Sequence, residues 1–393
     1  MSLDITIINS IEALEQFVPE WLAFLEAQPL GMSVYNHPKY LLAHFRHNPE
    51  GSRNLRLAIV AVREQGQIVC IAPLSIQEQQ FRLELSVKRL FPVHIRKITC
   101  PGNSFIFTNE PQKVFGWFSA VFETLKDKKI RFDLLVIYGL RNNSPFWDYC
   151  MTRLKGKPFR LYNVLAEAQC DQRVHLSVSM EVMFASIEGQ WRKSVRRNLK
   201  IFHQSVKEFR LERITEASQV EIFFDIMMKV SANSWQGKTF GLTDWKTEAR
   251  LKCWKEIADY GLLRSYILWA DNQPIAYILA YQYNDVFFGQ NVGYNLSAAK
   301  LAPGIVCLYY CLDDMMTHQP AQTYDFDFGT HSYKKIFANE EIESTIVFVA
   351  GSAKGRLLAF LQTFLNQFVH RTKRTLQKWG LTDRIRKLLK NKK

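Results

Sequence analysis

The order of the secondary-structure elements expected across residues 262–337 constrains the fold more than any other feature of this chain. The expected elements are strands at residues 263–270, 274–281 and 286–294, a helix from Pro303 to about His318, and a strand at residues 324–328. The first two strands flank Asp271-Asn272-Gln273 and predict a hairpin. Strands that alternate with a crossover helix favour α/β architecture. This segment therefore predicts a mixed sheet with a helix between two of its strands.

The first half of the chain repeats this order. It predicts strands at residues 55–62, 67–74, 97–107 and 132–138, a helix at residues 112–125, and two earlier helices at residues 11–25 and 38–46. Two blocks with the same plan suggest a duplication, with a boundary near residues 165–173. We expect an N-terminal domain over residues 1–168, a C-terminal domain over residues 169–350 and a tail over residues 351–393.

Composition indicates a packed protein in a reducing compartment. Apolar residues make up 47% of the 393 residues, which is enough for sizeable cores. Seven cysteines are scattered without metal-ligand spacing, so we expect neither a disulfide framework nor a metal site. Cys307 and Cys311 lie one helical turn apart among apolar residues, as core thiols do. The N-terminus lacks a signal-peptide pattern, and no apolar run has the length of a membrane span. We therefore expect a cytoplasmic protein.

The net charge of +14 is concentrated at the end of the chain. Residues 351–393 contain twelve Lys and Arg but one acidic residue, which leaves the other 350 residues nearly neutral. A helical stripe is expected to pack on the body, formed by Leu357, Leu358, Leu361, Phe364, Leu365 and Phe368. A basic amphipathic pattern follows, which is typical of binding to anionic lipid. We expect residues 371–393 to contact the inner face of a membrane; the alternative is a packed helix with a frayed end.

A second basic segment lies at residues 191–209. Val195, Leu199 and Phe202 recur at helical spacing and predict a buried face, whereas Arg196 and Arg197 lie off that stripe. One interpretation is a solvated basic face. The other is a platform for the phosphates of a ligand, because guanidinium groups bind phosphate through two hydrogen bonds.

Two features of residues 300–334 suggest acyl-transfer chemistry. Pro303 and Gly304 begin a helix, whose free N–H groups and dipole attract an anion such as phosphate. Asp325 and Asp327 are two residues apart on one strand, so both carboxylates are expected on the same face. Burial would raise their pKa and make a usable base. The alternative is that one Asp caps a turn and the other pairs with a lysine; His331 is a further candidate base.

The segment from about Trp191 to Phe337 resembles the GNAT-related acyltransferases named for the cellulose-biosynthesis protein CelD, which are cousins of the Fem-type peptidyltransferases. The matching residues are Arg196–Lys200, Ser234-Trp235 with Gly237, Gln273–Ala276, Gly293-Tyr294, Ala302–Gly304, and Asp325, Phe326, Gly329, Tyr333 and Lys334. The Gly-rich pyrophosphate loop that usual GNAT enzymes have before the helix is absent here. Residues 66–74 resemble the N-terminal half of the same family less specifically.

This resemblance implies two tandem GNAT-like domains of the α/β class with mixed sheets, followed by the basic amphipathic helix. It implies transfer of an acyl group, acetyl first among them, from acyl-CoA to an amine or hydroxyl of an envelope, polysaccharide or small-molecule acceptor. No tightly bound cofactor is expected. The implied catalytic residues are Asp325, Asp327, Tyr333 and Lys334. The implied donor-binding residues are Asn291, Gly293, Pro303, Gly304 and Ile305, and the acceptor-binding residues are Arg196, Arg197, Trp235 and Gln290.

Two other functions stay open at the level of sequence. Aminoacyl-tRNA could be the donor, as in the Fem-type cousins, with residues 192–200 and the tail on RNA; such binding would weaken steeply with salt. A binding protein without turnover could also use this frame, because a fold does not fix chemistry.

Overall fold

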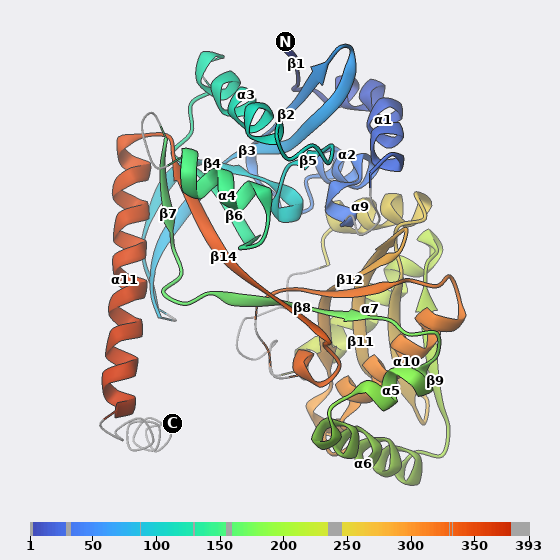
Figure 1. Cartoon of the computed structure of the whole chain (residues 1–393). Helices are drawn as coiled ribbons and strands as arrows, with labels where there is room; N and C mark the ends of the chain where they lie inside the picture. Colours follow the sequence, from blue (N-terminus) through green and yellow to red (C-terminus); the bar gives the residue numbers. More distant parts are fainter. Residues whose placement is uncertain are drawn as a thin grey trace. The chain divides into compact units, whose positions relative to one another are not determined.

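The computed structural model describes residues 3–28, 33–86, 88–128, 130–154, 159–234, 246–329, 331 and 333–378. In it the chain forms two compact units, each assembled from segments that are distant in the sequence (Figure 1). The first unit comprises Met1–Thr6, Arg53–Gln169 and Glu343–Lys393, and the second comprises Ile7–Ser52 and Cys170–Ile342. These units cut across the division into residues 1–168, 169–350 and 351–393, which stays a prediction about domains.

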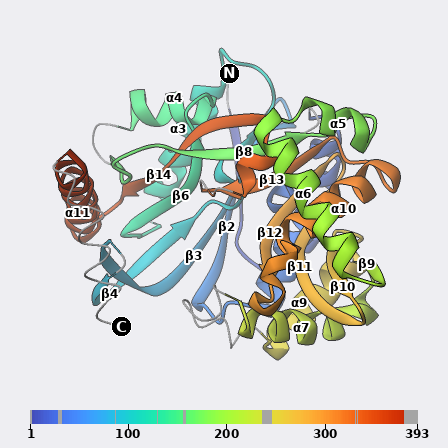
Figure 2. The same ribbon diagram turned by 90° about the horizontal axis from the view of Figure 1, so that it is seen from below.

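The second unit is built on a mixed sheet with the strand order β8-β13-β12-β11-β10-β9 (Figure 2). The strands are β8 (Gln169–His175), β9 (Phe209–Ile214), β10 (Ser265–Ala270), β11 (Gln273–Tyr283), β12 (Val286–Tyr294) and β13 (Thr323–Phe328). Neighbours are antiparallel except β12 and β13, which run parallel and are joined through helix α10 (Pro303–Thr317). The elements predicted from residues 262–337 are confirmed to within two residues.

Helices cover both faces of this sheet, because successive strand residues point to opposite sides. Tyr266 and Ile278 pack with helices α5 (Met180–Ser186), α6 (Gly189–Ser205) and α10. On the other face, the hydroxyl of Tyr277 hydrogen bonds with Ser231 of α7 (Ala217–Ala232), and the ring of Tyr281 lies 4.9 Å from that of Trp254 in α9 (Glu248–Asp259). Helix α2 (Pro38–His47) packs on α9, and α1 (Ile11–Glu26) packs on α2.

The two ends of α10 differ in how their backbone groups are satisfied. At the C-terminal end, the buried guanidinium of Arg264 donates to the carbonyl oxygens of Asp314 and His318 and pairs with the Asp314 carboxylate at 3.0 Å. A cation that binds the last carbonyls complements the helix dipole. At the N-terminal end, Ala302 supplies no side-chain cap. The helix is therefore fixed to the sheet at one end and open at the other.

The first unit repeats the plan of the second. Its strand order is β1-β2-β3-β4-β6-β14, with β5 on β3 and β7 on β14. The strands are β1 (Leu3–Ile8), β2 (Arg53–Glu64), β3 (Gln67–Leu85), β4 (Lys88–Thr99), β5 (Ile106–Phe107), β6 (Leu134–Arg141), β7 (Arg160–Asn163) and β14 (Glu340–Ala350). β4 and β6 are parallel and joined through α3 (Val114–Asp127). Helices α3 and α4 (Pro145–Arg153) cover one face of this sheet, and α11 (Ala353–Lys378) covers the other.

Two predicted strands of the first unit are wrong in their bounds. The strand expected at residues 67–74 is β3, which runs on to Leu85, and β4 already begins at Lys88. A strand was expected at residues 97–107, whereas β4 ends at Thr99 and a separate short strand, β5, follows at Ile106. Pro101 and Gly102 interrupt the extended backbone, and Gly102 has a φ of 75° that strands do not use.

Helix α11 is long and lies alongside β7 (red in Figure 1), but it turns a different face to the sheet from the one expected. Gly355, Leu358, Ala359 and Gln362 are buried, with Leu361 and Leu365 beside them. Leu357, Phe364 and Phe368, which were expected to pack on the body, are exposed. The contact face includes Leu358, Leu361 and Leu365 of the expected stripe but is rotated around the helix axis toward Gly355, Ala359 and Gln362. Most of the basic tail, residues 379–393, lies outside the described residues.

Two further expectations concern the cysteines and membrane-spanning segments. Cys307 and Cys311 are fully buried in the core of the second unit, as predicted, and burial raises the pKa of the Cys307 thiol to about 12. In the described part of the chain, every helix is too short or too polar to cross a bilayer.

Candidate functional site

A cavity of about 850 Å³ lies in the second unit where β12, β13 and the start of α10 meet. Its walls come from four segments. These are residues 289–292 and 294 of β12, Ala299 and residues 302–305 before and at the start of α10, residues 326–328 at the end of β13, and His331, Tyr333 and Lys334 after it. Eight residues predicted to form a site line it together: Gln290, Asn291, Pro303, Gly304, Ile305, Asp327, Tyr333 and Lys334.

The cavity exists because β12 and β13 separate after a short parallel pairing. Their register ends at Phe288 opposite Asp325. On its other edge β12 pairs with β11, but the register jumps from Gly289 to Asn291, so Gln290 is an extra residue in a β-bulge. Bulges twist and bend a strand and are common beside active sites. The bulge places Gln290 and Asn291 in the cavity wall.

Two glycines of β12 permit close packing around this separation. A Cβ on Gly289 would lie 2.4 Å from the hydroxyl of Tyr324, and a Cβ on Gly293 would lie 2.4 Å from the ring of Tyr277. Gly293 therefore packs against Tyr277 and does not line the cavity, so the structure does not place it with the other predicted donor-binding residues. A side chain at either glycine would push β12 away from its neighbours.

The open end of α10 faces the cavity. Ala302 begins the helix with a left-handed backbone (φ 49°), and the N–H groups of Ile305 and Val306 both donate to the carbonyl of Ala302. A Cβ on Gly304 would meet one atom, a ring carbon of Tyr294, at an ordinary 3.5 Å. This glycine is therefore not required by packing, and its backbone lies against the cavity. An uncapped helix start of this kind attracts anions.

Asp327 is the acidic residue of the cavity. Its backbone is left-handed (φ 62°), and its carboxylate accepts a hydrogen bond from the N–H of Phe328 at 2.6 Å. Burial raises the pKa of Asp327 to about 6, the neighbouring Asp325 adds to the rise, and Lys334 opposes it. A carboxylate that titrates near neutral pH is suited to general-base catalysis.

Asp325, by contrast, does not line the cavity. Its carboxylate accepts a hydrogen bond from Nε of Arg173 on β8 at 2.9 Å and another from the N–H of Asp327. The expectation that both carboxylates share one face is wrong, because the β8–β13 register shifts after Asp325 and the backbone reverses hand at Asp327. Asp325 thus fastens β13 to β8 and shapes the turn that presents Asp327. A catalytic role for Asp325 stays a prediction.

Lys334 stabilises the turn that follows β13. It is 3% exposed, and its ammonium donates to the carbonyls of Asp327 (2.9 Å) and Gly329 (2.8 Å). Burial lowers the pKa of Lys334, and the carboxylates of Asp327, Asp325 and Asp171 oppose that shift. The ammonium therefore lies beside the candidate base and orders the backbone around it.

Two aromatic residues complete this wall of the cavity. The rings of His331 and Tyr333 stack with their centroids 6.1 Å apart. Burial raises the pKa of Tyr333 to about 12, so its phenol stays protonated and can donate a hydrogen bond. Burial and the nearby Lys334 lower the pKa of His331, which makes its neutral imidazole a second candidate base.

Sequence reasoning missed a contribution from the N-terminal segment. Tyr35, in a short 3₁₀ turn (η1, Val34–Asn36), packs its ring 4.6 Å from that of Phe288, the last residue of β12 paired with β13. Tyr281 of β11 donates from its hydroxyl to the side-chain carbonyl of Gln290 at 3.2 Å. Burial raises the pKa of both tyrosines, so both hydroxyls stay protonated. No local pattern links Tyr35 to a strand some 250 residues later.

Three predicted acceptor-binding residues are not brought to the cavity. Arg196 and Arg197 lie on the exposed side of α6, where the guanidinium of Arg196 stacks over the ring of Phe184 at 5.4 Å. Trp235 lies outside the described residues. The functions predicted for these three residues stay predictions.

Comparison with known proteins agrees with this geometry. Residues 189–335, the segment that holds the cavity, match the family model "Acetyltransferase (GNAT) domain". No curated protein matches the chain by sequence.

The solved structures that resemble the chain include FemX and a tandem GNAT protein. The crystal structure of FemX superposes with a TM-score of 0.58 at 12% identity, covering 91% of this chain and all of the FemX chain. A tandem GNAT protein from the clavulanic acid biosynthesis pathway superposes with a TM-score of 0.50 at 11% identity, covering 89% of this chain and 99% of the other. The predicted fold class, two tandem GNAT-like units of α/β type with mixed sheets and a C-terminal helix, is confirmed.

Proposed function

We propose that this chain, a GNAT-type acyltransferase, moves an acyl group from acyl-CoA to an amine or hydroxyl acceptor in the cavity of its second unit. The observation that carries the proposal is the meeting of an uncapped helix start and a carboxylate of raised pKa in one cavity. A donor with phosphates needs the first feature, and an acceptor that must lose a proton needs the second. Acetyl is the acyl group proposed first, and no tightly bound cofactor is proposed.

The chemistry assigns a role to each wall of the cavity. The donor's phosphates bind at the N–H of Gly304 and the positive end of the α10 dipole, and its acyl arm runs between the separated ends of β12 and β13. The acceptor attacks the acyl carbon, its proton passes to Asp327, the carbon–sulfur bond breaks, and CoA leaves as the thiol or thiolate. Tyr333 and Lys334 stabilise the negative charge that develops on the carbonyl oxygen. Gln290 and Asn291 orient the two substrates from the bulge.

We also propose the subfamily of this chain and the class of its acceptor. Membership of the CelD-like acyltransferases is proposed from the residues from Trp191 to Phe337 quoted above, and it suggests an envelope, polysaccharide or small-molecule acceptor. Asp325, Gly293, Arg196, Arg197 and Trp235 are kept as candidates, although the described structure does not bring them into the cavity. A cytoplasmic location, with the basic end of the chain on an anionic membrane surface, is also proposed.

Calorimetric titration with CoA and acetyl-CoA tests the donor site, with two variants of one residue. Gly304→Asp places a carboxylate at the start of α10, where it suits the helix dipole but repels phosphate, so the protein stays folded and binding weakens by roughly tenfold or more. Gly304→Ala is the matched control, because its Cβ fits beside Tyr294, and it should bind within about threefold of wild type. Equal binding by the Asp variant would contradict a phosphate site there.

The same titration separates CoA from aminoacyl-tRNA. The similarity to FemX concerns the fold alone, so it does not favour tRNA over CoA. If folded protein ignores CoA and acetyl-CoA but binds tRNA with an affinity that falls steeply with salt, the donor is aminoacyl-tRNA.

A further inference from the structure

Helix α11 presents a row of large apolar side chains on the face opposite to its contact with the sheet. Leu357, Phe360, Phe364 and Phe368 are 58%, 56%, 55% and 55% exposed. They recur at intervals of three and four residues and therefore form one stripe along three helical turns. A contiguous row of exposed large apolar side chains is typical of an interaction surface.

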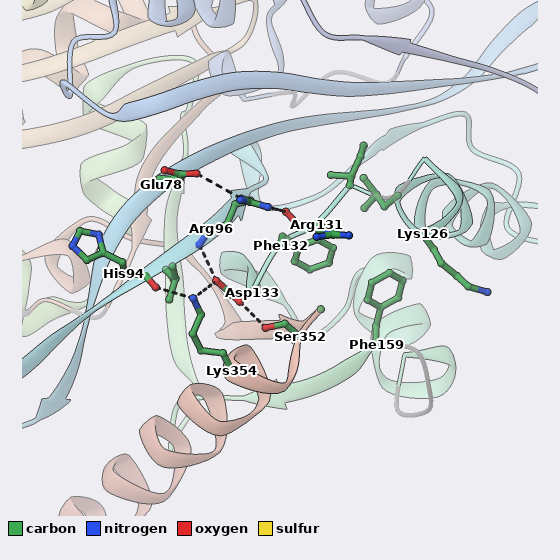
Figure 3. A pocket seen from close by; sticks show the side chains of 14 residues that line it. Glu78, His94, Arg96, Lys126, Arg131, Phe132, Asp133, Phe159, Ser352 and Lys354 are labelled. Carbon is green, nitrogen blue, oxygen red and sulfur yellow. Dashed lines mark hydrogen bonds and ion pairs between the residues drawn. The ribbon is translucent and has the colours of Figure 1, made fainter.

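The start of α11 is fastened to the first unit, which fixes the side that the helix turns outward (Figure 3). The carboxylate of Asp133, just before β6, accepts a hydrogen bond from the hydroxyl of Ser352 at 2.6 Å and pairs with Lys354 at 2.9 Å. Ser352 in turn accepts from the N–H of Gly355, and a Cβ on Gly355 would lie 1.8 Å from the Asp133 carbonyl oxygen. The helix therefore cannot rotate to bury its apolar stripe without breaking this cluster.

Further along, the inner face of α11 is held by polar contacts as well. Gln362 bonds with both the N–H and the carbonyl of Glu84, and Asn366 donates to the carbonyl of Val164. These contacts hold α11 to the first unit along at least three turns, so the outer stripe stays exposed.

The charged side chains that α11 itself carries are all basic, and its acidic neighbours Asp133 and Glu167 pair with Lys354 and His370. The 26 residues of α11 include no Asp or Glu, and the exposed cations are Lys354, Arg356, Arg371, Lys373, Arg374 and Lys378. Arg371 and Lys378 continue the line of Phe364 at intervals of seven residues. A second copy of this helix would bring cations against cations with no acidic partner, whereas an anionic surface matches both the charge and the apolar row.

We propose that the outer face of α11 binds an anionic lipid bilayer, with Leu357, Phe360, Phe364 and Phe368 inserted among the acyl chains near the headgroups and the flanking Lys and Arg on lipid phosphates. An amphipathic helix of this composition lies in the plane of the interface. The helix thereby holds the enzyme at a membrane surface. This proposal is independent of the acyl-transfer site, which lies in the other unit.

Vesicle flotation of the full-length protein tests the proposal. The probes are vesicles of phosphatidylcholine alone and of phosphatidylcholine mixed with phosphatidylglycerol. Wild type should float with the anionic vesicles and remain with the soluble fraction in the neutral ones. Phe360→Gln/Phe364→Gln should weaken binding to anionic vesicles by about tenfold or more, because two of the four inserted side chains are lost. Arg371→Glu/Arg374→Glu should weaken it as well, and added salt should weaken binding of wild type.

Ile222→Gln is the matched control, because Ile222 is 64% exposed on another helix, α7, far from this stripe in sequence. It should bind as wild type does, and thermal unfolding should show all variants folded. Equal flotation of wild type and the double Phe variant would overturn the proposal, as would absence of binding to anionic vesicles. A dimer in sedimentation velocity that the Phe variant dissociates, with flotation unchanged, would assign the stripe to a second copy.

Discussion

Asp327 has its side chain in the cavity, its backbone in the left-handed region and a pKa raised to about 6 by burial. If it is the base, the rate falls as the pH drops through about 6, because protonation removes the acceptor of the proton. Asp327→Asn should lower kcat/KM by about a hundredfold or more and remove this acidic limb. The pH–rate profile of both proteins checks this. Retention of the limb in the Asn variant would move the role to His331, and His331→Gln would then abolish it.

Asp327 should also reduce the stability of the free enzyme. Its pKa is raised on folding, from 3.8 to about 6, so the native state binds more protons in between, and stability falls as the pH rises across that window. Above pH 6 the full cost is present. Asp327→Asn should therefore raise the free energy of unfolding by roughly 1–3 kcal/mol at pH 7 and by little at pH 4. Urea unfolding at the two pH values measures this, and a gain of equal size at both would show that ionisation is not the cause.

At the scale of residues, the sequence predicts which residues form the site but not the direction in which each side chain points. Strand alternation predicted that Asp325 and Asp327 lie on the same face. In the structure, the register shift between β13 and β8 and the left-handed backbone of Asp327 turn Asp327 toward the cavity and leave Asp325 with Arg173. The contact of Tyr35 with Phe288 depends on tertiary packing, so no local pattern could predict it.

At the scale of elements, the attachment of α11 includes one close backbone contact, between Gly355 and Asp133. Gly355→Ala would place a methyl group 1.8 Å from the Asp133 carbonyl oxygen, so the helix start must shift. We expect the free energy of unfolding to fall by about 1–3 kcal/mol, as overpacking usually costs. Chemical unfolding followed by circular dichroism measures the loss.

Gly116→Ala is the control for that experiment. Gly116 lies near the start of α3, and a Cβ at this position would have no other atom within 4 Å. Alanine has the higher helix propensity, so this variant should gain about 0.5–1 kcal/mol. Equal and small effects at both glycines would mean that the contact with Asp133 does not hold α11.

The types and bounds of helices and strands are predicted well where the apolar periodicity ends at a Pro or Gly that starts or stops an element. Pro303-Gly304 marks the start of α10, and the bounds predicted for β12 agree with those in the structure. The face of α11 was harder, because Leu357, Phe360 and Phe364 are as apolar as the residues that pack inward. Periodicity alone cannot separate a core face from an exposed one when both are apolar.

At the scale of the whole molecule, two units share one plan, but we expect one donor site per chain. In the first unit, Phe105 follows β4 and packs against Phe118 and Phe146, at ring distances of 5.5 and 4.3 Å. Lys113, at the start of α3, pairs with the carboxylates of Glu64 and Glu110, both at 3.0 Å, and these would repel a phosphate. Calorimetry with acetyl-CoA should therefore give a stoichiometry of one. Two equivalents per chain would mean that both units bind donor.

The interleaving of the two units has a consequence for biosynthesis. The sheet of the first unit includes β14, and its outer layer is α11, so this unit needs residues from 343 onward before its cores can close. Helices α1 and α2 are synthesised some 200 residues before α9, on which α2 packs. Neither unit can fold from a contiguous half of these residues, so the nascent chain must hold exposed apolar surface until residues 343 onward have been synthesised. A chaperone that binds during translation would find its longest-lived target in the strands of the first unit.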